Sequence, residues 1–136
     1  MTTIKNLFET IESRDQWEQD TNLLYPMSLK SLFDVGTDHQ TTLMCIKPGM
    51  QQHLHYHRAG GDIFLILNGN GTLVSAALSH DEQGRTNESS QPVKAGDLYS
   101  IKPLEIHSLK NTGDVDLVIL NVAPSNHGDE DCIEVY

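Results

Sequence analysis

Three of the seven histidines in this 136-residue chain alternate with other residues, as His53, His55 and His57. Side chains alternate across a β-strand, so these three imidazoles are expected on one face of one strand. An acid, Asp62, stands five positions beyond His57, and His107 follows much later. Imidazole nitrogens bind divalent transition metals, and a carboxylate can complete such a site. A bare His-X-His is also compatible with an exposed, solvated strand face.

The spacing around these residues favours a metal site over a solvated face. They stand at fixed distances from three glycines, Gly49, Gly69 and Gly96, and from Asn111. The arrangement resembles the two motifs of the cupin superfamily. The first is G, five residues, HxH, three or four residues, E, six residues, G; the second is G, five residues, PxG, two residues, H, three residues, N. The resemblance covers residues 49–111, and the flanking strands extend it to about 41–123.

The resemblance implies one divalent metal, Fe, Zn, Ni or Mn, bound by His55, His57 and His107. Asp62 stands where the family has Glu. Because Asp is one methylene shorter, it can bind the metal directly, act through a water, or orient another ligand. His53 has no place in the motif, since a shifted register leaves no acid at the acid position. We expect His53 to be the catalytic residue, as a substrate contact or proton-transfer group, with a histidine at the barrel rim as the alternative.

The second motif departs from the family pattern at the turn before His107. Lys102 stands in the place of the usual Pro, and Leu104 in the place of the usual Gly. The distance from Gly96 to His107 is nevertheless the family's distance. We therefore expect a rebuilt turn that keeps His107 in position.

Short apolar runs separated by Gly and Pro predict an all-β fold. The resemblance makes it a cupin-type double-stranded β-helix, or jelly-roll barrel, with a short N-terminal helical segment. We expect one domain over 1–136. It divides into a helical and extended segment at 1–40, a barrel core with both motifs at 41–123, and an acidic tail at 124–136, either a solvated arm or an edge strand.

Periodicity gives the expected elements. An apolar face predicts helix over 1–20, and the polar run 79–91 predicts an exposed loop. The runs at 63–67 and 117–122 are apolar on both faces, so their outer face must be covered by the N-terminal helix or by a second copy. A homodimer is therefore expected. Strands are expected at 41–46, 52–56, 62–68, 72–78, 91–97, 98–101, 106–111 and 114–123.

Composition excludes several partners. The net charge is −10, with only nine Lys and Arg, so nucleic acid and anionic membranes are not expected partners. No apolar run approaches the ~18 residues of a membrane span. The N-terminus lacks the basic and apolar regions of a signal peptide. Two cysteines, Cys45 and Cys132, form no framework, which favours a cytoplasmic chain with reduced thiols.

We predict a metal-dependent cupin that acts on a small organic molecule inside the barrel. Fe would permit dioxygenase chemistry, whereas Zn, Ni or Mn would favour isomerase or lyase chemistry. The alternatives are a non-catalytic cupin that binds or senses a small molecule, and a cupin in which the metal is structural. Fold analogy does not choose among these functions.

Overall fold

The computed structural model describes residues 2–19, 27–34, 39–125 and 131–135. Residues 1 and 20 of the expected helix, and 126–130 and 136 of the tail, lie outside the described residues.

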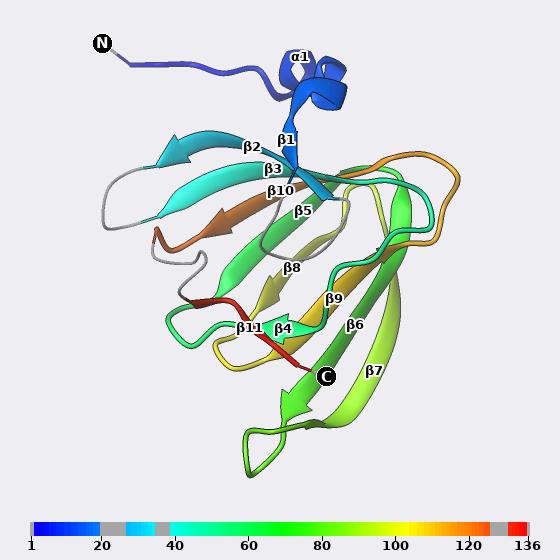
Figure 1. Ribbon diagram of the computed structural model, residues 1–136. Helices are drawn as coiled ribbons and strands as arrows, with labels where there is room; N and C mark the ends of the chain where they lie inside the picture. Colours follow the sequence, from blue (N-terminus) through cyan, green and yellow to red (C-terminus); the bar gives the residue numbers. More distant parts are fainter. Residues whose placement is uncertain (1, 20–26, 35–38, 126–130, 136) are drawn as a thin grey trace.

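Two antiparallel sheets form the barrel (Figure 1). The six-stranded sheet contains, in spatial order, β1 (Glu18–Gln19), β2 (Met27–Asp34), β3 (Gln40–Ile46), β10 (Leu117–Ala123), β5 (Asp62–Asn68) and β8 (Leu98–Ile101). The five-stranded sheet contains β11 (Ile133–Glu134), β4 (His55–Tyr56), β9 (Ile106–Asn111), β6 (Asn70–Leu78) and β7 (Arg85–Lys94). The predicted all-β fold is confirmed.

The main core lies between the two sheets. In β5, Asp62, Phe64 and Ile66 are buried, whereas Ile63 between them is half exposed. This alternation directs every second side chain inward. The cluster contains Met27, Met44, Ile46, Phe64, Ile66, Leu73, Val93, Ile101, Leu109, Leu117 and Ile119.

A second apolar cluster covers the outer face of the six-stranded sheet. Trp17, from the N-terminal segment, packs on Leu43, Cys45 and Val118. The expectation that this segment covers part of that face is therefore confirmed. Burial raises the pKa of the Cys45 thiol to about 11, so it is a small core residue and not a thiolate.

One ion-pair cluster fastens the N-terminal segment to the barrel. Asp116 Oδ2 lies 2.7 Å from Arg14 Nε and 3.0 Å from Lys47 Nζ. Burial raises the pKa of the Asp116 carboxyl, but the hydrogen bonds from Arg14 and Lys47 outweigh burial and hold it below its usual value. The carboxylate is thus charged at neutral pH and joins the two parts of the chain.

The structure corrects the expected N-terminal helix. Only α1 (Leu7–Glu12) is α-helical, followed by a 3₁₀ turn at Arg14–Gln16. Asn6 caps α1 by accepting the N–H of Glu9 at 3.0 Å. Two apolar residues of the predicted face, Ile4 and Phe8, are 88% and 76% exposed. They do not pack on the barrel, so this face lacks the tertiary packing that stabilises a longer helix.

Two expectations for the barrel were also wrong. The run 79–91 is not all loop, since β7 begins at Arg85 and pairs with β6 along most of its length. It is polar because β7 lies at the end of its sheet in the described chain, with nearly every side chain exposed. The strand expected at 52–56 is reduced to β4. Gln51 and Gln52 still bond to Lys110 and Leu109 of β9, but the regular strand is interrupted at His53 and Leu54.

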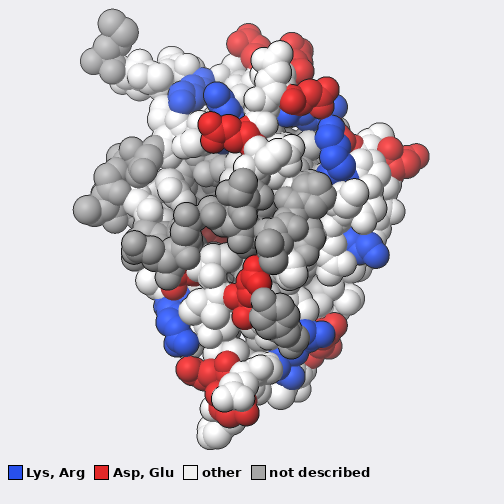
Figure 2. Space-filling view, in the orientation of Figure 1, with Lys and Arg blue, Asp and Glu red and all other residues white. Residues whose placement is uncertain are grey.

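The visible surface carries no basic patch. Figure 2 shows acidic and basic side chains interspersed over this face of the molecule. Within the described residues, every helix is too short and too polar to cross a bilayer.

Candidate metal centre

Three histidines converge at one end of the barrel core. His55 on β4 and His107 on β9 are paired across the ladder, and His57 follows directly after β4. One nitrogen of each ring lies within 4.8 Å of the others. The ring centroids of His55 and His107 are 4.2 Å apart, and both side chains are buried. The three residues that the resemblance assigns to the metal are therefore brought together.

The outer nitrogen of each ring is held by the backbone. His55 Nδ1 lies 2.7 Å from the carbonyl oxygen of His53, and His107 Nδ1 lies 3.2 Å from that of Glu105. His57 Nδ1 lies 2.6 Å from the carbonyl oxygen of Asp131. A carbonyl only accepts, so Nδ1 carries the proton and the Nε2 lone pair of the neutral ring is left for a metal. Histidine ligands in proteins are typically held in this way, so the donor set fits a divalent transition metal.

Burial keeps His55 neutral. Removal from water lowers the pKa of His55 to about 4, against smaller raising effects from the His53 carbonyl and Asp62. The neutral ring is the form that binds a metal.

The metal-free protein should lose stability as the pH falls below about 6.5. There the unfolded chain takes up a proton that folded His55 takes up only near pH 4. The loss should approach about 3 kcal/mol once the pH has fallen to about 4. Urea unfolding of the metal-stripped protein across this range measures it, and His55→Gln should show a shallower pH dependence. An equal slope in both proteins would assign the effect to other groups.

Asp62 faces the histidines from β5. Its carboxylate is 4% exposed, and Oδ2 lies 3.5 Å from His57 Nε2 and 4.0 Å from His107 Nε2. The group of described side chains close enough to share one ion contains the three histidines without Asp62. The shorter acid thus stands beside the site, within reach of two of its rings.

Two aromatic side chains, Phe64 and Tyr99, lie next to the histidines, and their position was not predicted from the sequence. The Phe64 ring lies 6.0 Å from the His107 ring and stacks on Tyr99 at 5.0 Å. Burial raises the pKa of Tyr99, and the charge of Asp62 raises it further, so the phenol stays protonated. The signal was available in the alternation of β8, which directs Tyr99 inward beside Phe64.

Other candidates lie away from the three rings. His53 is half-buried and contributes its carbonyl to His55, while its ring is not part of the histidine group. Arg58 is exposed and pairs with Glu82 at 3.4 Å. The Glu105 carboxylate accepts the backbone N–H of Lys102 at 3.0 Å, so it is a loop acid.

The C-terminal tail contributes to the histidine site through Asp131, a role that the sequence did not predict. β11 pairs with β4 at the edge of its sheet, so the edge-strand alternative is confirmed at Ile133–Glu134. Besides holding His57 through its carbonyl, Asp131 accepts the N–H groups of Arg58 and Ala59, each at 2.9 Å. The alternating apolar residues Ile133 and Val135, which join a cluster with Tyr56, were the available signal.

The rebuilt turn before His107 keeps the backbone that the family's glycine would have. Leu104 has φ +69°, in the left-handed region, and its N–H donates to the His57 carbonyl at 2.7 Å. A bulky side chain in this region is uncommon. The turn is thus held in a strained conformation beside the centre.

We expect Leu104→Gly to be more stable than Leu104→Ala by about 1 kcal/mol. Both variants lose the side chain, but only alanine keeps the left-handed penalty of ~1–2 kcal/mol. This reverses the usual order of stability, since in helices and strands an alanine variant is more stable than a glycine variant by ~0.5–1 kcal/mol. Chemical denaturation of both variants provides the measurement. Equal stabilities, or a more stable alanine variant, would show that the turn is not strained.

Comparison with known proteins places this chain in a family. Residues 42–123 match the family model of the cupin domain. The chain is 37% identical over 79 residues to the oxalate-binding protein of Thermotoga maritima, a match that covers 58% of this chain and 56% of that protein. The chain thus spans just over half the length of this curated relative.

Solved structures share the fold. One is a protein from Thermotoga maritima described as a predicted oxalate decarboxylase, with a TM-score of 0.65, 24% identity, and coverage of 82% of this chain and 95% of that one. Another is the oxalate decarboxylase of Bacillus subtilis, described with Mn(II) centres, with a TM-score of 0.62, 19% identity, and coverage of 81% and 28%. Since the family model covers more than half of the chain, and the barrel and its histidines are those of that fold, the chain belongs to the cupin family.

Proposed function

We propose that this protein binds one divalent transition metal at His55, His57 and His107 and acts there on a small organic carboxylate. The convergence of two buried imidazoles and one half-buried one, each with its Nδ1 held by a carbonyl, carries the proposal. Asp62 is proposed as a fourth ligand or as a group that orients the rings. The metal would supply Lewis-acid chemistry, or redox chemistry if it is Fe or Mn.

Two observations support a carboxylate ligand. Three or four protein ligands leave positions on the metal for a small chelating molecule. The curated relative is named for binding oxalate. We therefore propose oxalate or a similar dicarboxylate as the first compound to test, although the surface as a whole is acidic. That same name favours the alternative of a cupin that binds its ligand without turnover.

Metal analysis and calorimetry test this function together. Protein purified without added metal is expected to contain about one divalent ion per chain. Oxalate should bind the loaded protein and not the stripped one. Formation of formate and carbon dioxide, or oxygen consumption with Fe, would indicate catalysis, whereas binding alone would support the non-catalytic alternative. A chain that takes up no metal would overturn the proposal.

We propose His53 as the catalytic residue, because its half-buried imidazole stands two residues before His55 on the segment that leads into β4 and an imidazole can exchange a proton with a bound molecule. His53→Gln should then lower turnover and leave metal content unchanged, since the His53 ring is not part of the histidine group and the variant keeps the carbonyl that accepts from His55 Nδ1. Unchanged turnover would leave His53 as a histidine at the barrel rim.

We also propose a cytoplasmic homodimer. Ile63 and Leu98 are 48% and 68% exposed on the outer face of β5 and β8, and Leu65 lies directly opposite Leu98. The paired residues of β10, Leu120 and Val122, continue this apolar strip. Such a flat face suits the same face of a second copy.

Leu98→Asp should convert the dimer to a monomer in light scattering. The new carboxylate would be desolvated in the interface, which is costly. Ser90→Asp, at an exposed position of β7 in the other sheet, is the control and should leave the mass unchanged. A monomeric parent protein would remove the homodimer, and the metal site would not depend on that result.

A further inference from the structure

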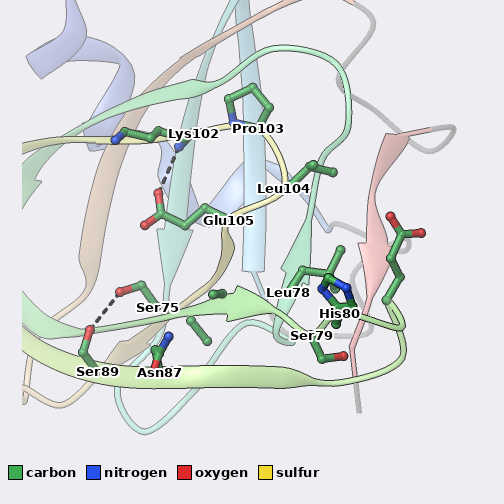
Figure 3. A pocket seen from close by; sticks show the side chains of 13 residues that line it. Ser75, Leu78, Ser79, His80, Asn87, Ser89, Lys102, Pro103, Leu104 and Glu105 are labelled. Atoms are coloured by element: carbon green, nitrogen blue, oxygen red, sulfur yellow. Dashed lines mark hydrogen bonds between the residues drawn. The ribbon is translucent and has the colours of Figure 1, made fainter.

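We propose that a groove between the β6–β7 hairpin and the β8–β9 turn binds a neutral, hydroxyl-rich small molecule, such as a sugar or polyol. The groove has a volume of about 680 Å³, within the ~300–1,000 Å³ range of small-molecule sites. Figure 3 shows the turn from Lys102 to Glu105 on one side, with Ser75, Asn87 and Ser89 on the other. The metal-site histidines and Asp62 are not among its described lining residues.

Unusual backbone conformations gather around this groove. Among the described residues, the non-glycine positions with left-handed backbone are Glu82, Asn87 and Leu104, with φ of 60°, 54° and 69°. All three line the groove. Asn adopts this region readily, whereas Glu and Leu do so only against steric repulsion from their own Cβ. Such conformations persist where the surrounding structure imposes them, and they concentrate at ligand-binding sites.

The polar lining suits a ligand that both donates and accepts hydrogen bonds. Three serine hydroxyls, one amide and one imidazole line the groove, from Ser75, Ser79, Ser89, Asn87 and His80. The Ser79 hydroxyl already donates to Asp81 and accepts the Gly84 N–H, so the groups offered to a ligand are chiefly those of Ser75, Ser89 and Asn87. The hydroxyls of Ser75 and Ser89 lie 3.1 Å apart, from neighbouring strands. Hydroxyl and amide groups can satisfy the hydroxyls of a sugar in either direction. Leu78 and Leu104 provide apolar surface for the C–H groups of the same molecule.

Charge argues against an anionic ligand in the groove. The charged lining residues are Lys102, Glu82 and Glu105, one cation against two anions. Glu82 pairs with Arg58, and Glu105 accepts the N–H of Lys102. Together with the net charge of −10, this lining offers a carboxylate or phosphate no concentrated positive field. No Phe, Tyr or Trp stands among the described lining residues to stack on an aromatic ligand.

The groove adjoins the metal centre through shared backbone. Ser75 on β6 is the ladder partner of His107. The turn that forms one wall donates the Leu104 N–H to the His57 carbonyl and accepts the His107 Nδ1–H through Glu105. A molecule in the groove would therefore contact the turn that positions two of the three histidines. Binding itself requires only the groove lining and no metal.

Chemical-shift titration of the full chain, with and without Zn²⁺, tests the proposal. The probes are glucose, galactose, N-acetylglucosamine and mannitol, with malonate as an anionic comparison, each at tens of millimolar. At least one neutral probe should shift the amide signals of Ser75, Asn87 and Ser89 in a saturable way, in both metal states. No saturable shift with any neutral probe, or tighter binding of malonate at these residues, would overturn it.

Matched variants on one strand locate the contact. Ser89→Val, which removes a groove hydroxyl, should weaken binding of the responding sugar about fivefold to tenfold, as expected for one lost hydrogen bond. Asn87→Gly removes the amide and tolerates the left-handed backbone, and should weaken binding similarly. Ser90→Val, next along β7 and outside the groove lining, should bind like the parent. Equal binding by Ser89→Val and Ser90→Val would contradict the assignment.

Discussion

His107→Ala should bind Zn²⁺ or Mn²⁺ more than about 100-fold more weakly than the parent protein. Loss of an outer-shell partner alone typically costs ~10–100-fold in metal affinity, and loss of a ligand should cost at least as much. His107 is 2% exposed and packs against the His55 ring. Because the position is buried, a side chain on the surface cannot take over its place as a metal ligand. Isothermal titration with each metal provides the measurement.

The controls separate metal loss from misfolding. His39→Ala removes an exposed histidine outside the centre and should leave metal affinity unchanged. His107→Gln keeps most of the side-chain volume, and its circular dichroism should match that of the parent even if it binds no metal. Near-parental affinity in a folded His107 variant would remove this histidine from the ligand set.

Asn111→Ala should destabilise the protein by about 3 kcal/mol. The Asn111 side chain is fully buried and donates to the carbonyls of Ile46 and Val115, each at 2.8 Å. Its Oδ1 also accepts the N–H of Gly113 at 2.9 Å. Three lost hydrogen bonds at ~1 kcal/mol each give this magnitude, and the buried partners left unsatisfied would increase it. Urea unfolding provides the measurement.

Asn68→Ala is the matched control for Asn111. Asn68 is exposed and makes one comparable bond, to the Asp116 carbonyl at 2.9 Å. Its removal should cost less than about 1 kcal/mol. A similar loss in both variants would show that the buried Asn111 network is not what holds the end of β9 to β3 and to the turn that follows.

The strands with a regular apolar or alternating pattern, and the three histidines of the site, could be predicted from the sequence. β5 and β9 were predicted with their observed bounds, because each is a clear apolar or alternating run between turn residues. His55, His57 and His107 were found because motif spacing fixes them. Gly49 and Gly96 were expected at turns, and both have left-handed backbone.

What the sequence missed depends on contacts between distant segments. β7 is polar because it lies at the end of a sheet, so its strand character comes from pairing with β6 rather than from an apolar pattern. Asp131 contributes a backbone carbonyl, which any residue could supply. The left-handed Leu104 leaves no mark in the sequence beyond the absence of the expected glycine.

The contact between His57 and Asp131 joins residues 74 positions apart. Contacts of such high sequence separation form slowly, because a long loop must close before they stabilise the chain. The centre also needs His107 from a third part of the sequence. Metal should therefore add little to the rate of folding and should act mainly by slowing unfolding, since a complete ligand set exists only after the barrel has closed.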